Sequence, residues 1–531
     1  MLHFAFFIYF LSPVVVHAQQ NIADHAKSVI TPFLLKQTIN YLASDSMKGR
    51  AIPAEGLDQA GEYISRQFQT LGLQPLNGSY FQDLLFCYTD LGTDNFISVV
   101  EGMATRNYKL KDDFIPYEIS GSNPAEGALI FAGYGITAPE YNYDDYKDLD
   151  VKGKIVVVLR QEPGQTDSMQ KRFAGADLSH YAWLQEKQKM AADHGAAGLI
   201  VLSGPLQFTM LKPRGYAWPS LSKVLPKDAL PLGYCETQKE LIPMVHAGES
   251  LINELFGNVD SLKQIQQRIE ATMRPHSFPI PGRIMAMNVS FTRTPVGGRN
   301  VIAFLEGSDP KLKDEAVIIG GHYDHIGVQR KQETAKEYVS SHDYIYNGAD
   351  DNASGTSGML AVAKAFATLT ENPKRSVIFM AFAGEEKGLL GSASYVRKPL
   401  WPLVKTAAML NLDMISRNNP DSLQIIGARQ NPGLVKIIRK QNKKVGFILA
   451  ESTDKQMDGG SDHASFFNKD VPSIFFFTGF HPDYHGVSDN PDRCDAEKAA
   501  RVARLAFLTA WKVANEGSHY KIVKPADSRD E

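Results

Sequence analysis

The sequence predicts an α/β fold with a mostly parallel central sheet, helices on both faces and a smaller inserted domain. Three observations support this prediction. After Gly298-Arg299-Asn300, short apolar runs alternate with helical patterns to the end of the chain. A separate set of strands and helices stands between about residues 121 and 275. The length of 531 residues exceeds that of one ordinary domain, and 43% hydrophobic residues are enough for real cores.

The N-terminus resembles an export signal. Residues 4–16 are almost entirely apolar, and Val16-His17-Ala18 has the small-residue pattern of a cleavage site. The apolar run is shorter than the ~20 residues that span a bilayer. We therefore expect a signal peptide at residues 1–18, a secreted or periplasmic protein and no stable membrane insertion. The alternative is an uncleaved anchor, because the segment before the apolar run has no Lys or Arg.

Two amphipathic helices are predicted next, in residues 19–120, which we assign to the N-terminal part of the main domain. Thr31-Pro32 is a typical helix start, and Leu35, Ile39 and Leu42 follow at helical spacing. The second helix carries apolar residues from Ala60 to Leu71 and stops at Gly72. Both are expected to pack on one face of the sheet.

The inserted domain is predicted at residues 121–275. It contains the apolar strands 155–159 and 198–202, with a helix between them, and no cluster of catalytic residue types. The main domain resumes at 276–520, with strands near 301–305, 317–321, 376–382, 408–412 and 471–478 and a closing helix at about 495–513. A polar tail is predicted at 521–531.

Charge and cysteine content exclude several classes of protein. The net charge is -3 and there is no basic run, so nucleic-acid binding is not expected. The three cysteines, Cys87, Cys235 and Cys494, are far apart and form no CxxC pair. They cannot form a zinc cluster, and at most one internal disulfide is possible.

Polar residues at or near the ends of the predicted strands indicate a metal centre. In an open α/β sheet that edge is where ligands bind. Burying neighbouring carboxylates is costly unless a positive charge lies between them. Two histidines with several carboxylates are ligands that zinc prefers, and they suit two ions that share one carboxylate. The candidates are His322, Asp350, Glu385, Glu386, Asp413 and His485. Asp350 is the expected bridge.

Each candidate alone also has a structural interpretation. Asp350-Asp351 could cap a helix, Glu385-Glu386 could be a solvated turn, and Asp413 could cap the next element. A histidine at a strand end is often merely structural. Only the combination, in this order along the chain, favours the metal centre. Of the two adjacent glutamates, one would bind metal and the other would handle the proton.

Six motifs together resemble the M28 family of di-zinc aminopeptidases. They are residues 320–325 (GGHYDH), 348–355 (GADDNASG), 383–386 (AGEE), 411–414 (NLDM), 460–463 (GSDH) and 484–485 (YH). The inserted unit resembles a protease-associated (PA) domain. This resemblance implies a three-layer α/β/α sandwich of the zinc-peptidase type, and an exported aminopeptidase that releases N-terminal amino acids from peptide substrates.

The resemblance also implies a role for each residue. One zinc ion would be held by His322, Asp350 and Asp413, and the other by Asp350, Glu386 and His485. Glu385 would be the general base. Tyr484 would hydrogen-bond the oxyanion, Asp324 would orient His322, and residues 459–463 would line the substrate pocket.

Other functions remain open. A metallocarboxypeptidase or dipeptidase of the same fold is one, and a carboxypeptidase would need a basic residue for the substrate carboxylate, for which Arg417 is the candidate. A glutaminyl cyclase would use one zinc ion. A receptor-like protein without activity would be expected to have lost ligands, and this chain has kept them.

Overall fold

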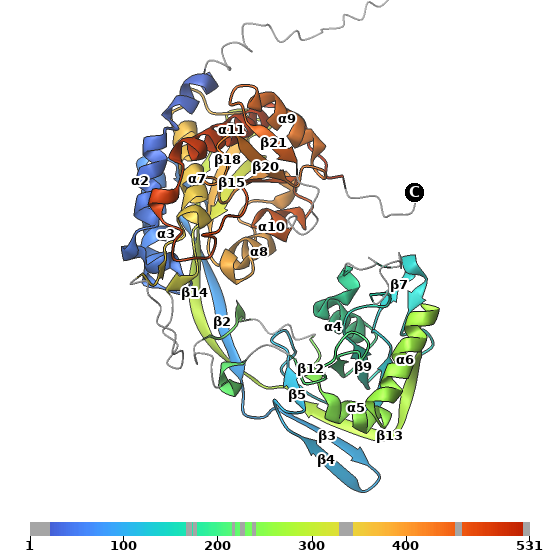
Figure 1. Ribbon diagram of the computed structural model, residues 1–531. Helices are drawn as coiled ribbons and strands as arrows, with labels where there is room; N and C mark the ends of the chain where they lie inside the picture. Colours follow the sequence, from blue (N-terminus) through green and yellow to red (C-terminus); the bar gives the residue numbers. More distant parts are fainter. Residues whose placement is uncertain are drawn as a thin grey trace, which may run out of the picture. The chain divides into compact units, whose positions relative to one another are not determined.

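The computed structural model describes residues 22–523 except 166–172, 174–177, 215–217, 223–228, 236–240, 329–342 and 452–458. The predicted signal peptide, and the predicted tail from residue 524 on, lie outside this part. The chain forms two compact units, one of residues up to 85 with those from 296 on, the other of residues 86–295 (Figure 1). The second unit thus includes residues 86–120 and 276–295, which the sequence had assigned to the main domain.

Most strands of the first unit belong to one mixed sheet, whereas β16 (Gly327–Val328) and β17 (Ile345–Tyr346) pair only with each other. Its order is β2-β14-β18-β15-β19-β22-β20-β21, with β11 beside β2 and β1 beside β14. Strands β18, β15, β19 and β22 are parallel, whereas β14 and β20 are antiparallel to their neighbours β18 and β22. The bounds are β1 Gln74–Pro75, β2 Phe81–Leu91, β11 Leu232–Tyr234, β14 Phe291–Leu305, β15 Ala316–His322, β18 Ser376–Phe382, β19 Thr406–Leu412, β20 Ser422–Ile426, β21 Ile448–Glu451 and β22 Ser473–Phe477.

Helices cover both faces of this sheet, as predicted. Every residue of β15, β18 and β19 is buried, which parallel strands covered on both sides require. Phe379 on one face of β18 contacts Phe68 and Phe366, which lie on α3 and α7. Phe382, three residues further and therefore on the opposite face, contacts Phe466 of α10.

Two helices of this unit, α2 and α11, have a side-chain cap at their first turn. Thr31 accepts a hydrogen bond from the Leu34 N–H and caps α2, and Asp495 caps α11 in the same way. None of the helices in the described residues is long and apolar enough to cross a bilayer. The bounds are α2 Pro32–Leu42, α3 Glu55–Thr70, α7 Gly355–Ala367, α8 Leu390–Arg397, α9 Pro432–Asn442, α10 His463–Phe467 and α11 Ala496–Asn515.

The second unit has its own sheet, in the order β4-β3-β13-β6-β9-β10-β12-β5. Strands β3 and β13, which flank the residues of the predicted insertion, pair with each other in this sheet. The bounds are β3 Phe96–Glu101, β4 Ala104–Tyr108, β5 Phe114–Pro116, β6 Pro124–Ala132, β9 Ile155–Leu159, β10 Gly198–Leu202, β12 Met244–Ala247, β13 Ser277–Asn288, α4 Leu184–Asp193, α5 Glu249–Phe256 and α6 Val259–Thr272. A short hairpin joins β7 (Thr137–Ala138) and β8 (Tyr143–Asp144).

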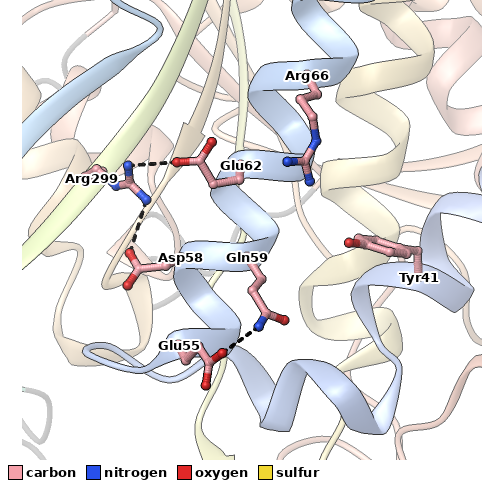
Figure 2. Close-up of a pocket in the computed structure, with 7 residues that line it drawn as sticks. All are labelled: Tyr41, Glu55, Asp58, Gln59, Glu62, Arg66 and Arg299. Carbon is pink, nitrogen blue, oxygen red and sulfur yellow. Dashed lines mark hydrogen bonds and ion pairs between the residues drawn. The ribbon is translucent and has the colours of Figure 1, made fainter.

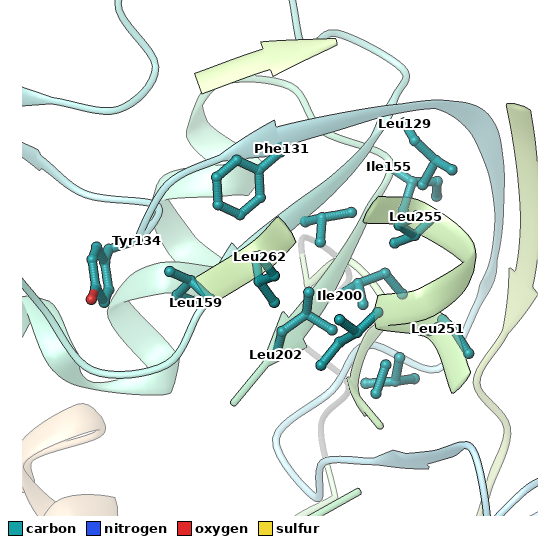
Figure 3. Close-up of a cluster of buried hydrophobic side chains, with 14 of the residues drawn as sticks. Leu129, Phe131, Tyr134, Ile155, Leu159, Ile200, Leu202, Leu251, Leu255 and Leu262 are labelled. Atoms are coloured by element: carbon teal, nitrogen blue, oxygen red, sulfur yellow. The ribbon is translucent and has the colours of Figure 1, made fainter. Parts of the chain in front are cut away.

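An apolar core fills the space between this second sheet and its helices (Figure 3). Ile155 and Leu159 of β9 and Ile200 of β10 point into it and meet Leu251 and Leu262 from α5 and α6. Alternate side chains of β9 and β10 point to the other face of the sheet, where Val156, Val158 and Leu199 belong to a second cluster. Both faces of these strands are therefore covered. The unit therefore has a core of its own.

Cys87 and Cys235 form a disulfide across the strand pair β2 and β11, and Cys494 is a free thiol. We therefore expect the denatured, unreduced protein to contain one reactive thiol, and the reduced protein three. Alkylation followed by mass spectrometry of the intact chain measures this. Labelling of all three cysteines without reductant would contradict the pairing.

Candidate metal centre

The centre begins where β15 ends. His322 is its last residue and is buried, and Asp324 and His325 follow within the same buried turn. The His322 Nδ1 atom lies 3.2 Å from the main-chain oxygen and 3.6 Å from the Oδ1 atom of Asp324. This leaves the Nε2 atom free to face the neighbouring carboxylates. Asp324 thus fixes the orientation of the His322 ring, as a partner of a metal-binding histidine does.

The next carboxylates come from the turn after β18. Asp324 accepts hydrogen bonds from the main-chain N–H groups of Glu385 (3.1 Å) and Glu386 (3.3 Å). The same buried carboxylate therefore holds both the histidine and the turn with the two glutamates. The Glu386 side chain is 5% exposed and the Glu385 side chain 15%, so the two adjacent residues differ in access to solvent.

A tight loop before α7 supplies Asp351. Gly348 starts this loop with a φ of 58°. A Cβ atom at Gly348 would lie 2.3 Å from the Asp351 carbonyl oxygen and 2.5 Å from the His325 ring, so that only glycine fits. The loop is anchored by Asn352, whose side chain donates to the carbonyl oxygens of His322 (3.3 Å) and Leu412 (3.0 Å). These bonds join the ends of β15 and β19 to the loop.

Two groups of ligand atoms meet at Asp351. Within the described residues, one group is His322, Asp351 and Asp413, and the other is His325, Asp351, Glu386 and His485. The Asp351 Oδ1 atom lies 3.3 Å from His322 Nε2, and its Oδ2 atom lies 3.1 Å from His485 Nε2. One oxygen of the same carboxylate thus faces each group.

The remaining members complete each group. Asp413 Oδ1 lies 3.4 Å from His322 Nε2, and Glu386 Oε2 lies 3.1 Å from His485 Nε2. Asp413 Oδ1 is buried without a hydrogen-bond partner, while its Oδ2 atom accepts from Ser461 at 2.8 Å. A buried carboxylate oxygen that faces a histidine nitrogen without a hydrogen bond fits a metal ligand. Imidazole nitrogens with carboxylate oxygens are a zinc donor set, so the residues present fit this metal.

Asp350, which the sequence analysis placed in the shared position, lies elsewhere. Its Oδ1 atom accepts hydrogen bonds from the Ser416 N–H (2.8 Å) and hydroxyl (2.6 Å), and its Oδ2 atom lies 3.4 Å from His481 Nε2. The expected bridge is therefore corrected to Asp351. The physical reason is that adjacent side chains leave the backbone in different directions, and the loop geometry selects the second aspartate.

The other predicted residues lie around the two groups. Tyr484 is 38% exposed, and its ring stacks on that of His485 with centroids 3.9 Å apart. Glu385 Oε2 lies 4.0 Å from His322 Nε2. Arg417, considered as a binder of a substrate carboxylate, instead pairs with Asp483 and lies 3.7 Å from Asp489.

His325 is a member of the second group that the sequence analysis did not single out. Its Nδ1 atom lies 2.7 Å from Glu386 Oε1, the carboxylate oxygen that does not face His485. His325 and His485 thus contact different oxygens of the Glu386 carboxylate. The sequence feature that could have identified His325 is its position in the same short run as His322 and Asp324.

Burial and charge shape the titration of the carboxyl groups. Burial has the largest effect on Glu385 and raises its pKa well above the usual value; the nearby His322 opposes this, and Asp413 and Asp462 reinforce it. Burial also raises the pKa of Asp351, but hydrogen bonds from His322 and His485 outweigh it, so that this pKa is lowered. Asp351 is therefore ionised, whereas Glu385 holds a proton more readily.

A separate hollow lies on the outer side of α3 (Figure 2). Its charges are mostly paired with one another: Arg299 binds Glu62 (3.1 Å) and Asp58 (3.3 Å), and Gln59 binds Glu55 (2.9 Å). No residue of the two ligand groups lines it. It shows no arrangement of side chains for chemistry.

Comparison with known proteins agrees with this centre. Residues 300–510 match the model of peptidase family M28, and residues 123–254 match that of the PA domain. Residues 300–510 are thus an M28 peptidase domain. The M28 match includes every residue of the two ligand groups, and the PA match lies within the second unit. The expected mixed α/β fold with an inserted PA domain is confirmed.

Three proteins similar to this chain have low sequence identity to it. Aminopeptidase YwaD of Bacillus subtilis is 24% identical over 426 residues, which is 78% of this chain and 73% of that protein. A Pyricularia oryzae protein named "Probable zinc metalloprotease" is 26% identical over 285 residues, 44% of this chain. The aligned part is 53% of that protein, so the chain spans about half its length. The structure of the aminopeptidase from Aneurinibacillus sp. strain AM-1 has a TM-score of 0.52 at 19% identity, covering 95% of this chain and 98% of that one, and shares the fold.

The shared position of Asp351 makes a prediction that separates it from Asp350. Asp351→Asn should weaken zinc binding by about tenfold or more, as for other changes around metal ligands, because it removes charge from both ligand groups. Asp350→Asn is the matched control, because the amide oxygen still accepts from Ser416. Zinc content after dialysis at fixed free zinc is the measurement. Equal losses in the two variants would contradict the assignment.

Proposed function

We propose that the protein is an exported zinc-dependent aminopeptidase that uses two zinc ions. The observation that supports this most is the pair of ligand groups joined by Asp351, with Glu385 beside them. His322, Asp351 and Asp413 would hold one ion, and Asp351, Glu386 and His485 the other. The printed names of relatives, an aminopeptidase and a zinc metalloprotease, support the same class of reaction.

Zinc held in these positions would polarise the scissile carbonyl and lower the pKa of a bound water from about 15.7 to about 7. The side chains of the protein supply the proton transfers. Glu385 accepts a proton from the water whose oxygen attacks the carbonyl carbon. It then donates this proton to the amine nitrogen as the C–N bond breaks. Burial raises the pKa of Glu385, so this carboxyl group takes up a proton more readily than an ordinary glutamate does.

Asp324 and Tyr484 have supporting roles in this proposal. Asp324 holds His322 and both glutamate N–H groups, so the general base and the ligands keep a fixed geometry. Tyr484 lies next to His485 and is part-exposed, where its hydroxyl can donate to the oxygen that becomes negative as the water attacks. Burial raises the pKa of Tyr484, so it remains protonated and able to donate.

The charges around the centre favour a free amine over a free carboxylate as the group recognised. The buried Asp462 is an acidic residue near the centre that holds no zinc ion and is not the base in this proposal, and an ammonium group is its natural counter-ion. Arg417, the basic residue considered for a carboxypeptidase, is engaged by Asp483 and Asp489. The aminopeptidase is therefore favoured over the metallocarboxypeptidase and dipeptidase. The two complete ligand groups argue against the one-zinc cyclase and the receptor-like protein.

Export is supported by two features. The apolar segment at residues 4–16 precedes a small-residue cleavage pattern. The Cys87–Cys235 disulfide is a feature of proteins in oxidising compartments. We propose a secreted or periplasmic protein, and N-terminal sequencing of the exported form, expected to begin after Ala18, tests it.

Glu385→Gln keeps the shape of the side chain but cannot accept the proton. We expect kcat to fall by about 10²–10⁴, the contribution of a general base, while the zinc content stays that of the wild type. The matched control is Glu371→Gln, at an exposed position after α7, which should leave both unchanged. Full turnover by Glu385→Gln would remove the assignment of the base.

A matched pair of peptides tests the whole function. One peptide has a free N-terminus and the other is N-acetylated. We expect cleavage only of the free peptide, loss of cleavage on treatment with a chelator, and recovery when zinc is restored. Cleavage of both peptides would instead indicate a carboxypeptidase or endopeptidase, and the products would show which.

A further inference from the structure

Arg50 is a buried cation that the proposed reaction does not use. It ends the short helical segment Asp45–Arg50 between α2 and α3, and its side chain is fully buried. Removing a guanidinium from water is costly unless its donors and charge are compensated. A side chain buried in this way has a role in the surrounding structure.

The donors of Arg50 are satisfied by main-chain oxygens from three parts of the chain. The Nε atom donates to Tyr323 (2.8 Å), Nη1 to Asn347 (2.8 Å) and to Leu42, and Nη2 to Gly348 (2.9 Å). In return, the Arg50 carbonyl oxygen accepts from the His325 N–H at 3.1 Å. Tyr323 and His325 flank Asp324, and Gly348 begins the loop that contains Asp351. Arg50 therefore joins the two segments that supply His322 and Asp351.

The charge of Arg50 has partners at longer range. Burial lowers the pKa of Arg50 to about 10, and the carboxylates of Asp324, Asp351, Asp489 and Glu386 oppose this. The guanidinium is thus charged at neutral pH. Asp489 also accepts the main-chain N–H groups of Asp350 and Asp351, so it restrains the same loop from another direction.

We infer that Arg50 is a positioning residue of the metal centre, which holds the segment 323–325 and the segment 347–348 in register so that the two ligand groups are assembled before metal binds. Arg50 does not touch either ligand group through its side chain. The inference rests on the proposed metal site and adds a residue of the N-terminal segment to it.

Charge and geometry predict opposite effects, which makes the inference testable. If Arg50 acted only through its charge, its removal would strengthen zinc binding, because a nearby cation repels zinc. If it positions the ligands, removal weakens zinc binding. Lysine keeps the charge, but its single nitrogen cannot reproduce the planar set of donors that serves four carbonyl groups.

The experiment uses the full-length exported chain with Arg50→Met, Arg50→Lys and, as a control, Arg299→Met. Arg299 pairs with acidic residues of α3 outside the centre (Figure 2). Zinc affinity is measured by competition with a chelator, and the cobalt-substituted proteins are compared by their visible spectra. We expect both Arg50 variants to lose about 10–100-fold in zinc affinity and to show an altered cobalt spectrum. The control should match the wild type in both measurements.

Wild-type or stronger zinc binding by Arg50→Met, with an unchanged cobalt spectrum, would overturn the inference. If the Arg50 variants do not fold, Asp45→Ala takes their place, because exposed Asp45 accepts from the Asn347 side chain at 2.9 Å and so joins the helical segment of Arg50 to the segment 347–348. A smaller loss of zinc affinity is expected there, and an unchanged affinity would overturn the inference. Neither the zinc affinity nor the cobalt spectrum depends on peptide cleavage. A wild-type protein that binds no zinc would therefore overturn the proposed function itself.

Discussion

The centre depends on a single constraint: several carboxylates are buried together where parallel strands end. Asp324, Asp351 and Asp413 are almost fully enclosed, and Glu386 lies beside them. In the absence of a cation such a set is unfavourable, because each carboxylate loses its hydration and repels the others. The histidines lie between these carboxylates. In the proposed site, two positive ions would relieve the same repulsion, and Asp351 is the carboxylate that faces both groups.

The residues around the ligands are arranged to keep this unfavourable cluster in one geometry. Each of these residues hydrogen-bonds either the main chain of a segment that carries a ligand, or the ligand oxygen that faces away from the histidine. Asp324 holds the glutamate turn, Asn352 joins the ends of β15 and β19, and Ser461 holds Asp413. Arg50 adds the N-terminal segment to this set. The sheet thus gives the ligands a common edge, and the polar contacts fix their directions.

The second unit shows a different use of buried charge. Lys187 is fully buried and donates to the Tyr134 carbonyl oxygen, and Asp145 accepts from the N–H groups of Tyr134 and Ile136. Burial lowers the pKa of Lys187 to about 7, with Asp145 opposing this. Lys187 and Asp145 each hydrogen-bond the main chain of the turn after β6. Their contacts are those of a polar network that closes a loop, whereas the two ligand groups lie in the first unit.

The sequence by itself determined the class of fold and most members of the centre. Local patterns were sufficient for this, because apolar strands and their terminal polar residues are contiguous in the chain: His322 after β15, Glu385 and Glu386 after β18, and Asp413 after β19. The resemblance to known motifs added the family. Tertiary structure alone decided which of two adjacent aspartates faces both groups, because this depends on the backbone path around Gly348. It also decided the contacts of Arg50, since Arg50 and Tyr323 are 273 residues apart and no local pattern relates them.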